Sequence, residues 1–259
     1  MNSMAIELHK NKSKDLNVLC KSAALQLNKA KLGSFDHLWN QPQNFVEPAN
    51  IRRNGWSGVS ILRLRNEQGE SEVFFLKRQE NQSRYSLRYL TGAPTFRYEA
   101  DALCLAHQED WPSVELVAFG SRVNADNGAM QALLVTRALE DTCMLEWEDQ
   151  GVDWNAHLPQ LRYAGEQILQ IHQSGWQHGA LFPAHLFINL KSGKIHLIDF
   201  ERARKRLSPQ WAAYADFTQF IRRCDWLPDA ALNALLASHA VHMPRLIDRL
   251  KARFPHRFQ

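Results

Sequence analysis

The chain has 259 residues, of which 45% are apolar and 22% charged, an ordinary balance for a globular protein with one large or bilobal domain. Its net charge of +4 is mild, so it favours acidic ligands such as nucleotides and does not indicate nucleic-acid binding. Four scattered cysteines form no Cys-x-x-Cys pair, which predicts reduced thiols in a cytoplasmic protein. No apolar run approaches the ~20 residues of a membrane-spanning helix, and the polar N-terminus does not resemble a secretory signal.

The first half of the chain predicts an N-terminal extension followed by a small antiparallel sheet. In the extension, residues 1–45, a polar tail of about 15 residues precedes an apolar period from Leu16 to Leu32 that predicts a helix. Alternating apolar residues then predict strands at Ser57–Leu64, Glu72–Lys77, Val114–Phe119 and Ala132–Thr136, with a helix at Phe96–His107. This order suits one sheet with one packed helix, an N-terminal lobe that spans residues 46–137.

After Arg137 the apolar pattern becomes helical. Ala156–Ser174 places its apolar residues on one face, and Pro209–Leu250 is mostly helical, with a loop and short strands between them. The sequence therefore predicts an α+β protein with two lobes, of which the C-terminal lobe, residues 138–259, is mainly helical.

Two features of the predicted N-terminal lobe indicate phosphate binding. The first is a glycine-bearing loop that runs into a strand, formed by Gly55, Trp56, Ser57 and Gly58. A missing Cβ would let a phosphate approach the backbone N–H groups, although a plain hairpin or bulge explains the same residues. The second is Lys77 at the end of an apolar strand, where a kinase places its phosphate-binding lysine, with Glu99 on the next helix to orient it. An exposed strand-end lysine and a solvated helix glutamate are the alternatives.

The strongest motif lies between His178 and Asp199. A protein-kinase catalytic loop has the pattern H-R-D-x-x-x-x-N, and a metal-binding Asp follows at the start of D-F-G. Here His178 fills the first place, His185 fills the Asn place, and Asp199 begins the D-F-G segment, but Ala180 stands where a kinase has its catalytic Asp. Asp199 is a predicted Mg²⁺ ligand. His185 is either a second ligand or a hydrogen-bonding group for the loop or a phosphate.

Three further positions extend the kinase-like pattern. Asp216 falls where such folds stabilise the catalytic loop with a buried Asp, although an Asp at a helix start explains it equally well. Arg137 to Asp141, with Leu139 among them, would form a hinge whose backbone meets adenine. The basic run from Arg202 to Arg206 would favour an anionic acceptor, or it is simply a solvated basic face.

From Phe35 to Asp216 the chain resembles the lipopolysaccharide kinase (Kdo/WaaP) family, and most closely its InaA-like branch. The segments that carry the resemblance are R-N-G-W-S at 53–57, F-L-K-R-Q-E-N at 75–81, P-T-F-R-Y-E at 94–99, L-V-T-R-A-L at 134–139, the loop at 178–188 and I-D-F-E at 198–201. The resemblance implies a protein-kinase-like fold. It also implies phosphate transfer from ATP, with Mg²⁺, to an inner-core sugar of lipopolysaccharide at the cytoplasmic face of the inner membrane. A His in the Asn place, as at His185, belongs to the family pattern.

Two departures from the family pattern leave activity open. Active sugar kinases of the family carry Asp where Ala180 stands, and Glu201 replaces the D-F-G glycine. Losing that Asp removes general-base assistance of about 10²–10⁴-fold, and Glu201 is a candidate to replace it. The first hypothesis is therefore an ATP-dependent sugar kinase, and the second is a nucleotide-binding pseudokinase or stress-related scaffold. A third, a metalloenzyme using His172, His178 and His185, fits no zinc-ligand spacing.

Overall fold

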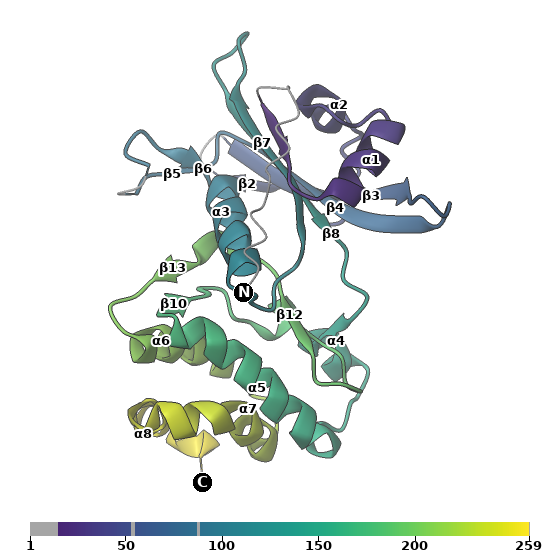
Figure 1. Ribbon diagram of the computed structural model, residues 1–259. Helices are drawn as coiled ribbons and strands as arrows, with labels where there is room; N and C mark the ends of the chain where they lie inside the picture. The colour runs from purple at the N-terminus through teal and green to yellow at the C-terminus, as the bar shows by residue number, and fades with distance from the viewer. Residues whose placement is uncertain (1–14, 53–54, 87–88, 259) are drawn as a thin grey trace, which may run out of the picture. The chain divides into compact units, whose positions relative to one another are not determined.

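The computed structural model describes residues 15–52, 55–86 and 89–258, and the chain divides into two compact units (Figure 1). The sheet unit contains residues 1–101 and 115–138, and the helical unit contains residues 102–114 and 139–259. Helix α3 (Thr95–Gln108) begins in the sheet unit and ends in the helical unit. The predicted N-terminal tail lies outside the described residues as far as residue 14.

The described part of the sheet unit is built on a six-stranded antiparallel sheet. Its order is β1 (Leu16–Val18), β7 (Leu116–Val123), β8 (Met130–Arg137), β4 (Ser71–Glu80), β3 (Gly55–Arg65) and β2 (Asn50–Arg52). Along β4, Phe74 and Leu76 are buried on one face, while Lys77 and Gln79 point to the other, as the two-residue period of a strand requires. All four strands expected in this region are confirmed, each with slightly different ends.

The N-terminal extension covers one face of this sheet. Helices α1 (Lys21–Lys29) and α2 (Phe35–Trp39) contribute Leu27, Phe35 and Leu38 to a core shared with Phe74 and Leu76. Burying such side chains removes apolar surface from water, which stabilises the folded state by roughly 25 cal/mol per Å². The described part of the extension is therefore a layer of the sheet unit.

The helix predicted for Leu16–Leu32 is wrong at its start. Leu16–Val18 form strand β1, which pairs with β7, and α1 begins only at Lys21. Leu16 and Val18 are buried whereas Asn17 is exposed. That alternation fits an edge strand. The segment is compatible with both a helical and a strand period, and pairing with the edge of β7 favours the strand.

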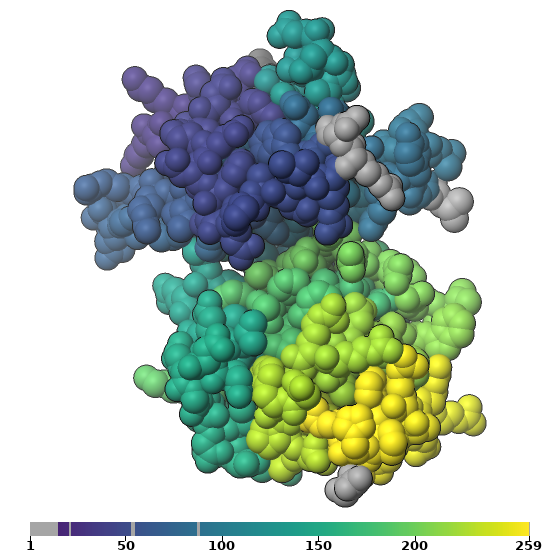
Figure 2. Space-filling model, turned by 180° about the vertical axis from the view of Figure 1, so that it is seen from behind, coloured from purple at the N-terminus to yellow at the C-terminus, as the bar shows by residue number. Residues whose placement is uncertain are grey.

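The helical unit contains the second half of the predicted elements. Its helices are α4 (Met144–Asp149), α5 (Leu158–Gln173), α6 (Pro209–Ile221), α7 (Asp229–His242) and α8 (Pro244–Arg253). α5 packs along α7, and α6 packs against α8. On the face seen in Figure 2, α7 and α8 lie side by side at the surface of this unit. The predicted helical region at 209–250 is thus three helices, and Pro244 stands in the first turn of the last one.

Two short sheets in the helical unit carry the candidate loop. Strand β10 (Trp176–Gln177) pairs with β13 (Arg204–Lys205), and β9 (Thr142–Cys143), β11 (Leu186–Ile188) and β12 (Ile195–Leu197) form the other sheet. The loop joins β10 to β11, and Asp199 follows β12. In the sheet unit, β5 (Ser83–Arg84) pairs with β6 (Ala93–Pro94).

The α+β class, with an antiparallel sheet first and helices after it, is confirmed. Each of the four cysteines carries a reduced thiol, as predicted. Among the described residues, no helix combines the length and apolar character needed to cross a membrane.

Candidate active site

In the sheet unit, Lys77 and Glu99 form an ion pair. Nζ of Lys77 lies 2.6 Å from Oε1 of Glu99, and the glutamate side chain is only 1% exposed against 19% for the lysine. A buried carboxylate is costly unless a cation and hydrogen bonds compensate it. The pairing predicted from the sequence is therefore present, and a solvated Glu99 is excluded.

Gln79 aligns α3 on strand β4, and the sequence analysis missed it. Its Oε1 accepts hydrogen bonds from the Thr95 hydroxyl at 2.8 Å and from the Phe96 N–H at 3.1 Å. The first N–H groups of a helix have no acceptor within the helix, so Gln79 supplies one. Gln79 and Lys77 point to the same face of β4. This strand therefore positions both the side chain that binds the start of α3 and the ammonium group that pairs with Glu99. The alternation of β4 was the signal that could have revealed it.

The predicted glycine loop is corrected to a strand. Gly55 to Gly58 lie in β3, where the last three of these residues pair with β4 and the first three pair with β2. Residues 53 and 54, which connect β2 to β3 in the sequence, lie outside the described residues. Ser57 pairs with Gln79 within this ladder. A contribution of these backbone groups to phosphate binding stays a prediction.

Aromatic packing accounts for the residue types in this strand. The ring of Trp56 lies 5.7 Å from the rings of Trp39 and Phe45. A Cβ placed on Gly58 would come within 2.6 Å of the Phe45 ring, closer than carbon atoms pack. Gly58 therefore leaves room for the N-terminal extension on this face of the sheet.

The side chain of Arg137 serves the sheet unit. Its guanidinium pairs with Glu72 and, at 2.6 Å, with Glu115, and its N–H donates to the Glu115 carbonyl at 3.1 Å. Burial lowers the pKa of Arg137, but the two carboxylates outweigh burial and raise it above its ordinary value. Leu139, half-buried, follows at the start of the main segment of the helical unit. Contact between this backbone and adenine stays a prediction.

In the helical unit, the candidate loop is held through its own backbone. The Ala180 N–H donates to Nδ1 of His178 at 3.2 Å, and the Ala180 carbonyl accepts from Nδ1 of His185 at 2.9 Å. A carbonyl oxygen can only accept, so Nδ1 of His185 carries a proton, and Nε2 of the neutral ring keeps its lone pair. Ala180 is 1% exposed. The place of the missing Asp is thus a buried methyl group within a hydrogen-bonded turn.

His178 is buried and uncharged. Its ring packs edge-on against Phe200, with the ring centres 4.4 Å apart. Burial lowers the pKa of His178 to about 4, although the charges of Asp216 and Asp199 act in the opposite direction. His178 therefore supports the loop as a neutral hydrogen-bond acceptor and packing group.

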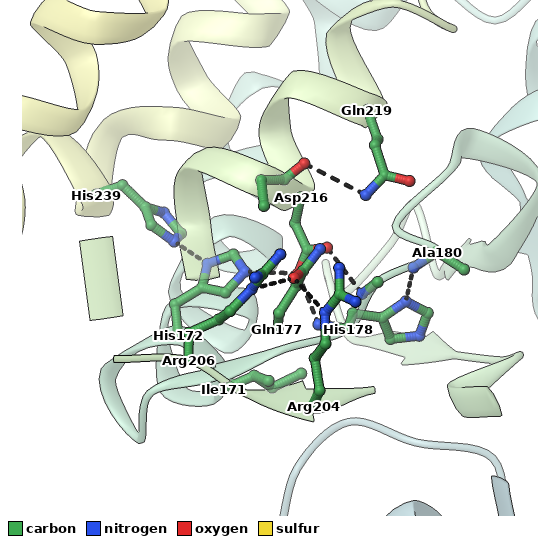
Figure 3. A network of polar contacts seen from close by, with 12 residues as sticks. Ile171, His172, Gln177, His178, Ala180, Arg204, Arg206, Asp216, Gln219 and His239 are labelled. Carbon is green, nitrogen blue, oxygen red and sulfur yellow. Dashed lines mark hydrogen bonds and ion pairs between the residues drawn. The ribbon is translucent and has the colours of Figure 1, made fainter. Parts of the chain in front are cut away.

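Asp216, in the middle of α6, stabilises the loop through hydrogen bonds (Figure 3). Its carboxylate accepts from the His178 N–H at 2.7 Å, the Gly179 N–H at 2.8 Å and Nε2 of His172 at 3.2 Å. Burial raises the pKa of Asp216, but the hydrogen bond from His172 and the other donors outweigh it, and the net pKa is lowered. The predicted buried Asp under the loop is confirmed, and a position at a helix start is wrong.

The turn that Asp216 holds requires glycine at position 179. Its φ is +84°, and a Cβ there would lie 2.5 Å from the carbonyl oxygen of Arg202. Both the backbone conformation and the space exclude other side chains.

The β11–β12 hairpin brings Asp199 to His185. Leu186 pairs with Leu197, and the Ile198 N–H donates to the His185 carbonyl at 3.2 Å. Oδ2 of Asp199 lies 3.7 Å from Nδ1 of His185. The backbone of Asp199 is left-handed, with φ 66° and ψ 59°. Such conformations of non-glycine residues concentrate at functional sites.

Asp199 and His185 suit a cation that brings further oxygen ligands with it. The Asp199 carboxylate is 31% exposed and the His185 side chain 22%. Mg²⁺ at phosphate sites usually takes one or two protein ligands and completes its shell with phosphate and water oxygens. Within the described ranges, no three His, Cys, Asp or Glu side chains lie together as a metal site. The alternative built on His172, His178 and His185 therefore has no site in that part of the chain.

Known proteins resemble this chain over most of its length. A sequence model of the lipopolysaccharide kinase (Kdo/WaaP) family matches residues 36–238. Protein InaA of Escherichia coli (strain K12) is 26% identical in an alignment 213 residues long, which covers 78% of this chain and 93% of InaA. A solved structure, WaaP in complex with acyl carrier protein, is similar at 18% identity with a TM-score of 0.49, over 87% of this chain and 97% of the other. Because the family match spans well over half of the sequence, this chain belongs to the lipopolysaccharide kinase (Kdo/WaaP) family.

Proposed function

We propose that this protein is an ATP-dependent phosphotransferase that acts on a core sugar of lipopolysaccharide, or on a related anionic glycolipid, at the cytoplasmic face of the inner membrane. The observation that carries the proposal is the Lys77–Glu99 pair, at 2.6 Å with the carboxylate buried. Kinases hold their phosphate-binding lysine in this way. Membership of the lipopolysaccharide kinase family supports the same chemistry.

Each candidate residue then has a defined task. Lys77 binds the α- and β-phosphates of ATP and Glu99 orients it, while Asp199 and Nε2 of His185 bind Mg²⁺. When bound, Mg²⁺ neutralises charge on the phosphate oxygens. The acceptor hydroxyl oxygen forms the new bond to phosphorus, the bond to ADP breaks, and the hydroxyl proton passes to water. Asp216 keeps the loop in place through backbone N–H groups.

Ala180 makes the proposed transfer slow. A methyl group cannot accept the hydroxyl proton, so general-base assistance of about 10²–10⁴-fold is absent. Positioning and electrostatic stabilisation, which dominate phosphoryl transfer, depend on other residues. Glu201 lies in the turn Phe200–Arg202, with its carboxylate 3.9 Å from Nε of Arg202. That Glu201 acts as a replacement base is a separate prediction.

Turnover tests the proposal directly. With Mg-ATP and lipopolysaccharide core oligosaccharide, we expect the purified protein to release ADP in an acceptor-dependent manner. Lys77→Met should abolish this release, while Lys29→Met, an exposed charge on α1, should leave it unchanged. ADP release no faster than in the blank without acceptor would contradict transfer to this acceptor.

A nucleotide-binding pseudokinase is the second candidate, and the buried Ala180 favours it. It predicts that Mg-ATP raises the melting temperature while turnover is absent. Ala180→Asp would then gain turnover of about 10²-fold or more over the wild-type background. An unchanged melting temperature with Mg-ATP would contradict both candidates, because each requires nucleotide binding.

A further inference from the structure

An exposed leucine lies immediately before helix α6. Leu207 is 93% exposed, and Trp211, in the first turn of the helix, is 50% exposed. An apolar residue that precedes a helix cap often packs against the first turn of its own helix. Leu207 precedes the cap residue Ser208, but its exposure shows that it does not pack there. Leu207 and Trp211 therefore present apolar surface to the solvent at the same end of α6.

Hydrogen bonds hold the backbone on both sides of Leu207. After it, the Ser208 hydroxyl oxygen accepts the Trp211 N–H at 3.2 Å and caps the helix. Before it, the Arg206 N–H donates to the Gly175 carbonyl at 2.8 Å. In Figure 1 this connection between β13 and α6 lies at the left edge of the helical unit. The bonded backbone on either side keeps the Leu207 side chain at the surface.

Basic residues surround this apolar surface. Residues 202–215 contain four basic residues, three of them exposed, and no acidic one, and the acidic residue that precedes them is Glu201. Helix α8 has four basic residues against one acidic residue. It adjoins the same part of α6, because the guanidinium carbon of its Arg249 lies 4.1 Å from the centre of the Tyr214 ring, one helical turn after Trp211. The surface around Leu207 and Trp211 is therefore positively charged.

We propose that Leu207, Trp211 and the basic residues around them dock the helical unit on a membrane surface of acidic phospholipids. An aliphatic side chain is stabilised in the acyl region of a membrane, and a tryptophan ring prefers the boundary with the headgroups. Lysine and arginine side chains attract negatively charged headgroups. In its choice of a membrane as partner, the inference rests on the proposed function, whose acceptor is a glycolipid.

The small size of the apolar surface favours lipid over a protein partner. Within residues 176–240, Leu207 and Trp211 are the exposed large apolar side chains. A stable interface with another protein buries about 800 Å² on each partner around an apolar centre. A membrane needs no such area, because a few inserted side chains and the attraction between opposite charges act together.

Vesicle sedimentation without nucleotide or metal tests this docking surface. We expect the whole chain to bind vesicles of phosphatidylglycerol mixed with phosphatidylcholine at least about tenfold more tightly than vesicles of phosphatidylcholine alone. Leu207→Ser should weaken binding to the acidic vesicles by at least about tenfold. Leu145→Ser changes a matched exposed leucine on α4, which has acidic and no basic residues, and should alter binding by less than about twofold. Equal binding to the two kinds of vesicle, or equal effects of the two variants, would overturn the proposal.

Two controls separate docking from folding and from self-association. Leu207→Ser should melt at the temperature of the wild type, because the side chain it replaces is 93% exposed. The competing occupant of this surface is a second copy of the chain. Sedimentation equilibrium without lipid should show no dimer that depends on Leu207, and a dimer that Leu207→Ser dissociates would overturn the proposal.

A third control separates docking from catalysis. Soluble core oligosaccharide reaches the protein without a membrane, so Leu207→Ser should release ADP with this acceptor at the wild-type rate. Loss of vesicle binding with unchanged ADP release supports a docking role for Leu207. A wild-type protein that binds acidic vesicles but releases no ADP would contradict the proposed transfer and leave the docking surface established, so the two failures are distinguishable.

Discussion

The Lys77–Glu99 pair and the loop around Ala180 differ in which kinase-like features they contain. In the sheet unit the charged side chains themselves are retained, with a 2.6 Å contact and a buried carboxylate. In the helical unit the supports are retained, since Asp216 accepts from the His178 and Gly179 N–H groups. Residue 180 makes its hydrogen bonds through its own N–H and carbonyl. The hydrogen bonds of this loop at position 180 therefore need no polar side chain there.

Removing Asp216 should have the largest effect on stability, because it breaks the buried hydrogen bonds that hold the loop in the helical unit. Asp216→Ala leaves the His178 and Gly179 N–H groups and His172 without their buried acceptor. We expect the free energy of unfolding to fall by about 4 kcal/mol. Urea denaturation measures it, and Asp248→Ala, an exposed carboxylate on α8, should change it by less than about 0.5 kcal/mol. Equal effects of the two variants would show that the loop is held by other contacts.

Removing Lys77 tests the ion pair of the sheet unit. Lys77→Met leaves the carboxylate of Glu99, which is 1% exposed, without its ammonium partner. We expect a loss of about 3 kcal/mol in unfolding free energy, and most of that loss should disappear in Lys77→Met with Glu99→Leu, where no charge is left buried. The same denaturation experiment on the single and double variants measures the coupling. Additive losses would mean that the two side chains act independently.

Acid should make the helical unit less stable through its buried histidines. His178 is held neutral, and burial lowers its pKa from 6.5 to about 4. The unfolded chain takes up this proton near pH 6.5 while the folded chain does not, so stability that is complete above pH 6.5 falls as the pH drops towards 4. Burial, aided by the charge of His172, also lowers the pKa of His239, which adds to the loss. For one histidine the slope is about 1.4 kcal/mol per pH unit.

His178→Asn measures that slope. The asparagine carbonyl can still accept the Ala180 N–H, but it takes up no proton. Urea denaturation between pH 6.5 and 4.5 should show a pH dependence weaker by about one proton, or about 1.4 kcal/mol per pH unit. His256→Asn, an exposed histidine of the same unit, should leave the slope unchanged. A slope in His178→Asn equal to that of the wild type would mean that His178 is charged in the folded protein.

Local patterns in the sequence were sufficient for the helical side of the site, because its residues are close in the chain. His178, His185 and Asp199 belong to one strand–loop–hairpin segment, and the register Leu186 to Leu197 brings them together. Asp216 could be found because its distance from the loop follows a known pattern. Its third donor, His172, could not, since the contact depends on how α5 packs against α6.

Strand β4 shows why the sequence could not separate two adjacent cations. Lys77 and Arg78 both follow an apolar run, but the kinase-like pattern predicted a role only for Lys77. Arg78 is fully buried on the opposite face, where it donates to the carbonyl oxygens of Trp39 and Pro42 and to the Ser60 hydroxyl at 2.8, 2.9 and 3.0 Å. The Trp39 and Pro42 carbonyls lie in the N-terminal extension, which no short-range pattern connects to β4. The face covered by the N-terminal extension had to be known first.

That covered face gives the smallest predicted effect, at Gly58. A methyl group there meets the Phe45 ring at 2.6 Å, and Phe45 is only half-buried, so the ring can move away. We expect Gly58→Ala to cost about 1 kcal/mol in unfolding free energy, and Gly58→Ala with Phe45→Ala to add little to the cost of Phe45→Ala alone. Nucleotide binding, measured as the Mg-ATP melting shift, should stay the same. If Gly58→Ala instead removes the shift and leaves stability intact, the glycine serves phosphate approach, and the sheet side keeps its kinase function in the backbone as well as in Lys77.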